Sequence, residues 1–250
     1  MESYDTNDKF WYLKNCGLCE RLSTEQIERI ESVARIRTFP AKSFVYLPSD
    51  SADAVMLLVS GRVKLYHITA DGKQSSLAFI EAGEVFGELT VLDAGKREGF
   101  AETVSKSSII LIPGDEMRLL MEEASSVALG ITRLIGFRRR SVERRLKSLM
   151  FRSNRDRLIS LLLELSERYG EPTPDGSYLD VKLSHQDMAS MIGSTRETVT
   201  LTLGELQYER LIKIQRRRIT LVNIESLAMS IGEDSPSSTG RTKRSAVPAE

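Results

Sequence analysis

Two short polar segments, close together in the chain, have residue types that begin helices and can hydrogen-bond to base edges. Ser184–Asp187 has the S-x-x-D form of a capping box, and Gly193 is placed to end the helix that this box begins. Ser194–Glu197 repeats the box and predicts a second helix that continues to about Arg210. Two helices joined by a tight glycine-containing turn form a helix-turn-helix, and we expect one here.

The second predicted helix carries side chains able to read base edges. Its apolar residues share one face at about 100° per residue, which leaves Arg196 and Glu197 near the start of the opposite side. Arg196 can donate two hydrogen bonds to guanine O6 and N7, and Glu197 can accept one from cytosine N4. Glu197 can also serve as a helix-capping carboxylate, and the two roles are compatible. The candidate DNA-contacting residues of the two helices are Ser184, His185, Thr195, Arg196, Glu197, Thr200 and Leu201.

A basic hairpin is predicted directly after these helices. Ile212–Gln215 and Ile219–Leu221 alternate as two short strands, with three consecutive arginines between them. Adjacent positive charges repel one another unless solvent or phosphate groups compensate them, and beside a helix-turn-helix we favour phosphates. The candidates for phosphate contact are Lys213, Arg216, Arg217 and Arg218.

The first third of the chain has the pattern of antiparallel strands. Residues 55–59 and 63–67 are apolar at alternate positions, which is typical of half-buried strands, and Asp71-Gly72 predicts a hairpin turn. Many short strands separated by glycines indicate a double-sheet jelly roll or barrel. An amphipathic helix at about residues 23–33 precedes them.

From about Ser125 the apolar period changes to that of a helix of about 25 residues, roughly 38 Å long. An apolar stripe of this length needs a partner, and a twofold-related copy of the chain is the simplest one. The alternative is that the helix packs only on its own β-domain. The stripe consists of Val127, Ile131, Leu134, Ile135, Val142, Leu146 and Leu149.

These patterns predict an α+β protein with four segments. Leu158–Tyr169 is expected to be a helix and Gly170–Gly176, which contains two prolines, a loop. The expected segments are a β-roll sensor domain over residues 1–125, a dimerisation helix over 126–150, a winged helix-turn-helix DNA-binding domain over 151–231 and a disordered tail over 232–250.

Composition excludes several classes of protein. The 250 residues include 35 Lys and Arg against 35 Asp and Glu, so only a local basic patch can face nucleic acid. The apolar runs are far shorter than the roughly 20 residues that span a bilayer, and no export signal is visible, so we expect a cytoplasmic protein with no membrane partner. No catalytic triad, metal-ligand or phosphate-loop spacing appears, so we expect no enzyme activity.

Several motifs together resemble the catabolite activator and fumarate-nitrate regulator (Crp/Fnr) family. They are, in order, Gly61-Arg62-Val63, Asp71-Gly72, Gly83-Glu84, Phe86-Gly87-Glu88-Leu89 and Ser194–Val199. The resemblance covers about residues 10–230, and Lys182–Thr200 is also similar to the cyanobacterial global nitrogen regulators. It implies a cyclic-nucleotide-binding-type β-roll, a long dimer helix and a winged helix-turn-helix. The partners that it implies are a second copy of the chain, an inverted repeat in double-stranded DNA, and RNA polymerase.

The same resemblance locates an effector site and indicates that it is altered. The Gly87–Leu89 motif of the cyclic AMP site is intact, but Glu98-Gly99 aligns with its phosphate-binding Arg-Ser pair, and Val142-Glu143 with its adenine-reading pair. We therefore expect an effector other than cyclic AMP, of unknown identity. The alternatives are a shifted phosphate contact at Arg97, which lies one residue early, or a regulator without an effector. The candidate effector-binding residues are Gly87, Glu88, Leu89, Arg97, Arg138, Val142 and Glu143.

Arg138 and the cysteines each have two interpretations. Arg138 and Glu143 match positions that shape the 2-oxoglutarate pocket of the nitrogen regulators, but the facing arginine of that branch aligns with Gly99. Arg138 is thus either an anion ligand or a solvated arginine. Cys16 and Cys19 form a bare C-x₂-C, where iron–sulfur members of the family use four cysteines. We expect two packed cysteines, or alternatively a redox dithiol, and we assign no metal or cofactor.

Overall fold

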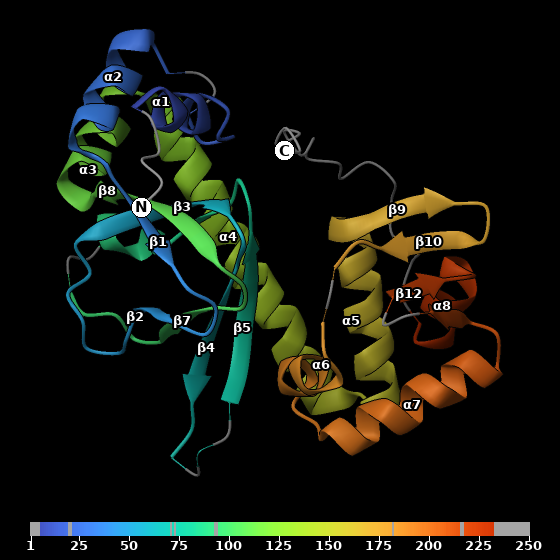
Figure 1. Ribbon diagram of the computed structural model, residues 1–250. Helices are drawn as coiled ribbons and strands as arrows, with labels where there is room; N and C mark the ends of the chain where they lie inside the picture. The colour runs from blue at the N-terminus through green and yellow to red at the C-terminus, as the bar shows by residue number, and fades with distance from the viewer. Residues whose placement is uncertain are drawn as a thin grey trace. The chain divides into compact units, whose positions relative to one another are not determined.

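A computed structural model describes residues 6–19, 22–70, 72, 74–92, 95–181, 183–215 and 218–232. The chain divides into two compact units at Ser141–Val142, inside a long helix, and each unit is described by itself (Figure 1). Most of the expected disordered tail and the predicted turn residues Arg216 and Arg217 lie outside the described residues. None of the described helices is both long and apolar enough to cross a membrane.

The first unit is built on two four-stranded antiparallel sheets, ordered β1-β8-β3-β6 and β2-β7-β4-β5. This arrangement is the predicted double-sheet roll. The strands are β1 (Arg35–Phe39), β2 (Phe44–Tyr46), β3 (Ala54–Ser60), β4 (Arg62–Ile68), β5 (Gln74–Glu81), β6 (Val85–Phe86), β7 (Phe100–Thr103) and β8 (Ser107–Pro113). The hairpin predicted at Asp71-Gly72 joins β4 to β5, although Asp71 itself is not among the described residues.

Helices cover the outer face of the first sheet (Figure 1). They are α1 (Thr6–Lys14), α2 (Thr24–Val33), α3 (Gly114–Glu123) and the start of α4 (Ser125–Phe151). The prediction of a half-buried strand at residues 55–59 is wrong, because β3 is buried on both faces. Met56 and Leu58 pack between the sheets, whereas Val55, Leu57 and Val59 pack under the helices. The helix α1 was not predicted from the sequence.

The long helix α4 has 27 residues, close to the length that was expected, but its stripe has two environments. Val127 and Ile131 are completely buried in the core of their own unit, and Leu134 and Ile135 pack against that core. Val142 and Leu146 remain 52% and 57% exposed. The prediction of one continuous stripe for a second copy is therefore wrong for the first half of the helix, because the roll already covers it.

The second unit combines four helices with a small antiparallel sheet. The helices are α5 (Asn154–Tyr169), α6 (His185–Ile192), α7 (Arg196–Tyr208) and α8 (Ile224–Ser230), and the strands are β9 (Gly170–Thr173), β10 (Gly176–Leu179), β11 (Ile212–Gln215) and β12 (Arg218–Leu221). The sheet order is β11-β12-β10-β9. The loop predicted at Gly170–Gly176 is instead β9, its turn and the first residue of β10. Pro172 is tolerated because β9 is an edge strand.

Candidate functional site

The two helices α6 and α7 form the predicted helix-turn-helix. Ser184 caps α6 in a complete capping box with Asp187, and Gly193 ends this helix with a φ of +62°. Helix α7 begins one residue later than predicted, because Thr195, not Ser194, is the N-cap and accepts a hydrogen bond from the N–H of Thr198.

This shift bears on the capping role of Glu197. The carboxylate of a capping box belongs three residues after the cap, at the position that Thr198 occupies. Glu197 is therefore not the reciprocal partner in such a box, and its side chain is exposed. An acidic group in the first turn still interacts favourably with the helix dipole.

Helix α7 separates an inward apolar face from an outward face. Val199, Leu203 and Leu206 are buried, as the helical period predicts. The exposed residues of the outward face are Arg196, Glu197, Thr200, Leu201 and Gly204. Leu201 is 69% exposed, and an apolar side chain at such a position can contact a thymine methyl group.

His185 and Thr200 connect the two helices. His185 Nδ1 lies 2.7 Å from Thr200 Oγ1, and the Thr200 hydroxyl donates to Arg196 O at 2.9 Å. The Thr200 hydroxyl has one hydrogen, which it donates to Arg196 O. His185 Nδ1 is therefore the donor in its contact with Thr200 Oγ1. The His185 ring thus holds Thr200 beside the first turn of α7, next to Arg196.

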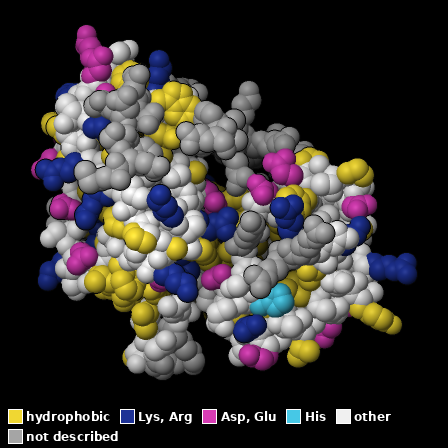
Figure 2. Space-filling view, in the orientation of Figure 1, with side chains coloured by type: hydrophobic (Ala, Val, Ile, Leu, Met, Phe, Trp, Pro, Cys, Tyr) yellow, Lys and Arg dark blue, Asp and Glu magenta, His cyan; other side chains and the backbone are white. Residues whose placement is uncertain are grey.

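Two basic side chains of the hairpin β11–β12 interact with other residues of the second unit. Lys213 Nζ forms an ion pair with Asp175 Oδ2 at 2.8 Å, and this lysine lowers the pKa of the Asp175 carboxyl. The Arg218 guanidinium lies 5.6 Å from the centre of the Tyr178 ring. Figure 2 shows basic and acidic side chains interspersed on the visible face, in keeping with the zero net charge.

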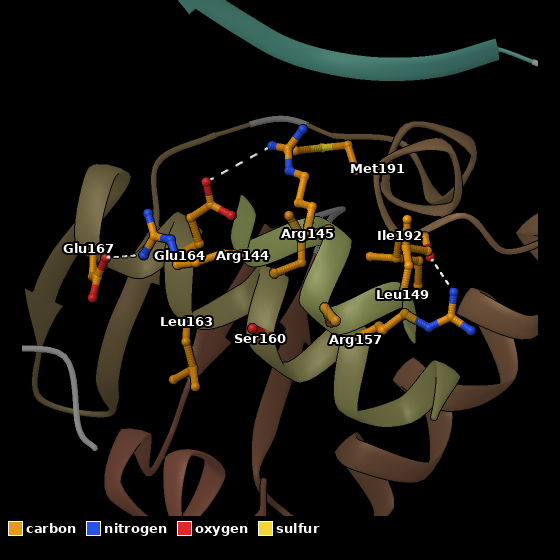
Figure 3. Close-up of a pocket in the computed structure, with 12 residues that line it drawn as sticks. Arg144, Arg145, Leu149, Arg157, Ser160, Leu163, Glu164, Glu167, Met191 and Ile192 are labelled. Carbon is orange, nitrogen blue, oxygen red and sulfur yellow. Dashed lines mark hydrogen bonds and ion pairs between the residues drawn. The ribbon is translucent and has the colours of Figure 1, made fainter. Parts of the chain in front are cut away.

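The turn of the helix-turn-helix borders a pocket that is lined by residues of α4, α5 and α6 (Figure 3). Arg157 of α5 donates through Nη1 to Ile192 O at 2.9 Å and to Gly193 O at 3.5 Å. A Cβ atom on Gly193 would lie 2.9 Å from Leu149 Cδ2, so Leu149 packs closely against the turn. Arg157 and Leu149 therefore fix the end of α6, from which α7 continues.

Arg157→Ala is expected to lower the free energy of unfolding of the second unit by about 1–3 kcal/mol, since it leaves carbonyl oxygens at the end of α6 without their donor. The matched control is Arg155→Ala, which removes exposed ion pairs to Glu205 and Glu209 and should cost about 0–1 kcal/mol. Denaturant unfolding measures both. Equal losses in the two variants would contradict a special role for Arg157.

In the first unit, the charged side chain of Arg97 is buried in the roll. Its side chain is 7% exposed and donates to Ala54 O at 2.5 Å and to Gly87 O at 3.2 Å. The guanidinium also lies 4.7 Å from the centre of the Tyr46 ring. Burial lowers the pKa of Arg97 and raises that of Tyr46. Arg97 Nε has no hydrogen-bond partner among the described residues, so the guanidinium keeps a buried donor.

The residues aligned with the phosphate-binding pair have surroundings that differ from those of Arg97. Glu98 is exposed, and a Cβ atom on Gly99 would lie 3.0 Å from Tyr66 O and 3.1 Å from His67 Cε1. Arg97 thus supplies the side chain that contacts the Gly87 carbonyl, and Glu98 faces solvent. The cause is local pairing: backbone hydrogen bonds from Arg97 to Asp50 and from Ser49 to Arg97 turn the Arg97 side chain inward and the next one outward.

A buried ion pair connects the Gly87–Leu89 motif, called the cassette below, to α4. Glu88 is 3% exposed and accepts a hydrogen bond from Arg138, which also donates through Nη2 to Val85 O at 2.7 Å. Arg138 is thus not a freely solvated arginine. Of the other candidates, Leu89 is exposed, and Val142 and Glu143 belong to the second unit.

Sequence reasoning missed Tyr46 and Ala54 as partners of Arg97. Neither residue belongs to a motif, so only the strand pairing reveals them. Within the described ranges, no group of three or more His, Cys, Asp or Glu side chains could hold a metal ion.

Comparisons with known proteins match both units. Residues 36–124 match the cyclic nucleotide-binding domain family, and residues 156–229 match the Crp-like helix-turn-helix domain family. A global nitrogen regulator from Synechococcus elongatus is 35% identical over 196 residues, which cover 78% of this chain and 88% of that protein. A CRP-like cAMP-activated global transcriptional regulator from Mycobacterium tuberculosis is 24% identical and covers 86% of this chain and 96% of its own.

Two solved structures have the same fold. A CooA mutant from Carboxydothermus hydrogenoformans has a TM-score of 0.71 at 22% identity and covers 80% of this chain and 88% of its own. The c-di-GMP responsive global regulator CLP of Xanthomonas campestris has a TM-score of 0.67 at 22% identity and covers 80% of this chain and all of its own. At these identities the likeness concerns the fold alone.

Proposed function

This chain belongs to the Crp/Fnr family of DNA-binding transcription regulators, and from that premise we propose that it binds an inverted-repeat operator as a homodimer, under the control of a small anionic effector in the roll. Its relatives are transcription regulators and not enzymes. We also propose a cytoplasmic location and RNA polymerase as a further partner. The functional domains that we propose are the segments given above, which end at residues 125, 150 and 231.

The exposed face of α7 is the observation that carries the DNA-binding part of the proposal. Arg196 and Glu197 are exposed at the start of a helix whose opposite face is buried, where a recognition helix meets base edges. Sequence selection from random duplexes by the purified protein tests it. An inverted repeat with half-sites about 34 Å apart is the expected product. Selection of unrelated or single half-sites would count against the dimer.

The charges around Gly87 support an anionic effector. Arg97 offers a buried guanidinium donor, and Arg138 reaches the same cassette from α4 through Glu88. An anion that contacts both arginines would compete with Glu88 for Arg138, and so would change how α4 is held. A ligand shifts an equilibrium only through such a difference in contacts between two states.

Cyclic AMP is expected to bind about 10- to 150-fold more weakly than a micromolar ligand, because a ribose hydroxyl that donates to Glu88 must displace one charge-assisted bond from Arg138, worth about 1.5–3 kcal/mol. Calorimetric titration with cyclic AMP, cyclic GMP and 2-oxoglutarate measures this, with wild type beside Arg138→Ala. Tight binding of cyclic AMP to the wild type would refute the expectation.

The inward Arg97 favours a second candidate, a cyclic-nucleotide-responsive regulator in which Arg97 binds the phosphate. This candidate requires that cyclic AMP binds at low micromolar concentration and that its binding strengthens binding to the operator. The Arg97→Lys variant should then bind cyclic AMP more weakly. The Glu88–Arg138 ion pair favours a third, because protein side chains connect the cassette to α4 directly. An effector-free regulator would bind its operator equally well as purified protein and in cell extract.

A further inference from the structure

The two cysteines lie together in the turn that follows α1. Cys16 and Cys19 are free thiols, 3% and 2% exposed, and the N–H of Cys19 donates to Cys16 O at 2.8 Å. The turn is therefore tight, and both sulfur atoms lie in the core beneath the helices of the first unit.

The environments of the two sulfur atoms are unequal. The Cys19 thiol and the backbone N–H groups of Leu18 and Cys19 hydrogen-bond to Cys16, and these donors hold the pKa of Cys16 below its usual value despite burial. The pKa of Cys19 shifts in the opposite direction, because its hydrogen bond to Cys16 and its own burial raise it. Thiolate is the nucleophilic form of cysteine, so Cys16 is the attacking atom of the pair.

A small oxidant can reach Cys16. A small cavity is lined by Cys16, by Trp11, Tyr12 and Asn15 of the α1 region, and by the strand residues Leu57 and Val59. A water molecule takes up roughly 30 Å³, and hydrogen peroxide is only slightly larger. The cavity has space for about one such small molecule beside Cys16.

We propose that Cys16 and Cys19 are a peroxide-oxidised dithiol that forms a reversible disulfide within one chain. The Cys16 thiolate attacks one oxygen of hydrogen peroxide, the O–O bond breaks, and a sulfenic acid forms as hydroxide leaves and takes up a proton to become water. The Cys19 sulfur then attacks the Cys16 sulfur, gives up its proton, and expels a second water. Two thiols are oxidised by two electrons, and one peroxide is reduced to two waters.

The oxidation state of this pair is transmitted to α4. A Cβ atom on Gly130 would lie 2.6 Å from Leu18 Cδ1, so the residue between the cysteines rests directly on the α4 backbone. Val127 and Ile131 of α4 share a core cluster with both cysteines. Because close-packed cores transmit small shifts, we expect the new S–S bond to move Leu18 against α4. This inference does not depend on the proposed effector or operator.

The first experiment treats reduced full-length protein with one equivalent of hydrogen peroxide, then denatures it in N-ethylmaleimide and measures its mass. We expect loss of both alkylation sites together, a mass lower by two hydrogens before alkylation, and recovery of both sites with dithiothreitol. Two sites still alkylated, an irreversible gain of oxygen, or a disulfide between chains would each overturn the proposal. This measurement needs no variant and therefore no assumption about variant folding.

Single variants test the order of attack. Cys19→Ser should stop at a Cys16 sulfenic acid that dimedone captures, whereas Cys16→Ser should give no dimedone adduct at the same dose. Similar adducts in both variants would contradict Cys16 as the attacking atom.

Hydrogen exchange tests the link to α4. In oxidised wild type, the amides around Gly130 should exchange at least about tenfold faster or slower than in reduced wild type. The control is the variant with both cysteines changed to serine, whose exchange peroxide should leave unchanged. Exchange that is identical in oxidised and reduced wild type would overturn the link. The single tryptophan, Trp11, lines the same cavity and gives a fluorescence signal for the reaction itself.

Discussion

Val142→Asp combined with Leu146→Asp is expected to convert the protein from a dimer to a monomer and to weaken binding to the full operator by about 10²–10⁴-fold. Both side chains are more than half exposed in the single chain, which leaves them available to a second copy. Burying each such side chain stabilises a dimer by roughly 1.5–3 kcal/mol, and aspartates facing each other across a twofold axis would add repulsion. Loss of the dimer removes the gain that two linked half-site contacts provide.

The exposure of these two residues also predicts that the monomer stays folded. Ile131 belonged to the same predicted stripe, but it is completely buried, so Ile131→Asp should instead unfold the first unit. Lys147→Asp is the matched control, because it adds a carboxylate to an exposed position of the same helix about 100° away from Leu146. Light scattering at micromolar concentration and circular dichroism distinguish the three results. A wild type that is already monomeric would contradict the proposed dimer.

Local signals in the sequence were sufficient where a few adjacent residues determine the geometry. Ser184, Asp187 and Gly193 predicted both ends of α6, because a capping box and a left-handed C-cap depend only on nearby backbone. The start of α7 was predicted one residue too early, because serine and threonine are both good N-caps and Thr195 is the one used. The choice depends on which hydroxyl reaches a free N–H group, and residue type does not contain that information.

Long-range packing explains what the sequence did not predict. One periodic stripe along α4 contacts the roll in its first half and is exposed in its second, since periodicity marks an apolar face but not its partner. Arg97 entered the roll because pairing with Ser49 and Asp50 fixed its orientation, whereas counting residues from Glu88 pointed to Glu98. The contacts of Tyr46 and Ala54 with Arg97 come from strands that are distant in sequence.

Arg196→Ala is expected to weaken binding to the preferred operator by roughly 5- to 150-fold, which corresponds to about 1–3 kcal/mol, and to relax the preference at one base pair of each half-site. Arg196 is exposed at the first position of α7, and the hydrogen bonds among His185, Thr200 and the Arg196 carbonyl hold the backbone there. A bidentate arginine contact discriminates guanine from the other bases, so its loss should affect one column of a selected sequence profile.

Lys213→Ala is the matched comparison from the basic hairpin. A lysine that contacts phosphate contributes equally to all sequences, so this variant should weaken specific and non-specific binding alike and reduce the salt slope by about 1. Its effect should be the smaller of the two, because Asp175 already compensates part of the Lys213 charge at 2.8 Å. Binding titrations over a range of salt concentrations, with matched and single-mismatch operators, separate the two variants. If both variants lose affinity with the same sequence profile and the same salt slope, base reading by Arg196 and phosphate contact by Lys213 are not separate functions.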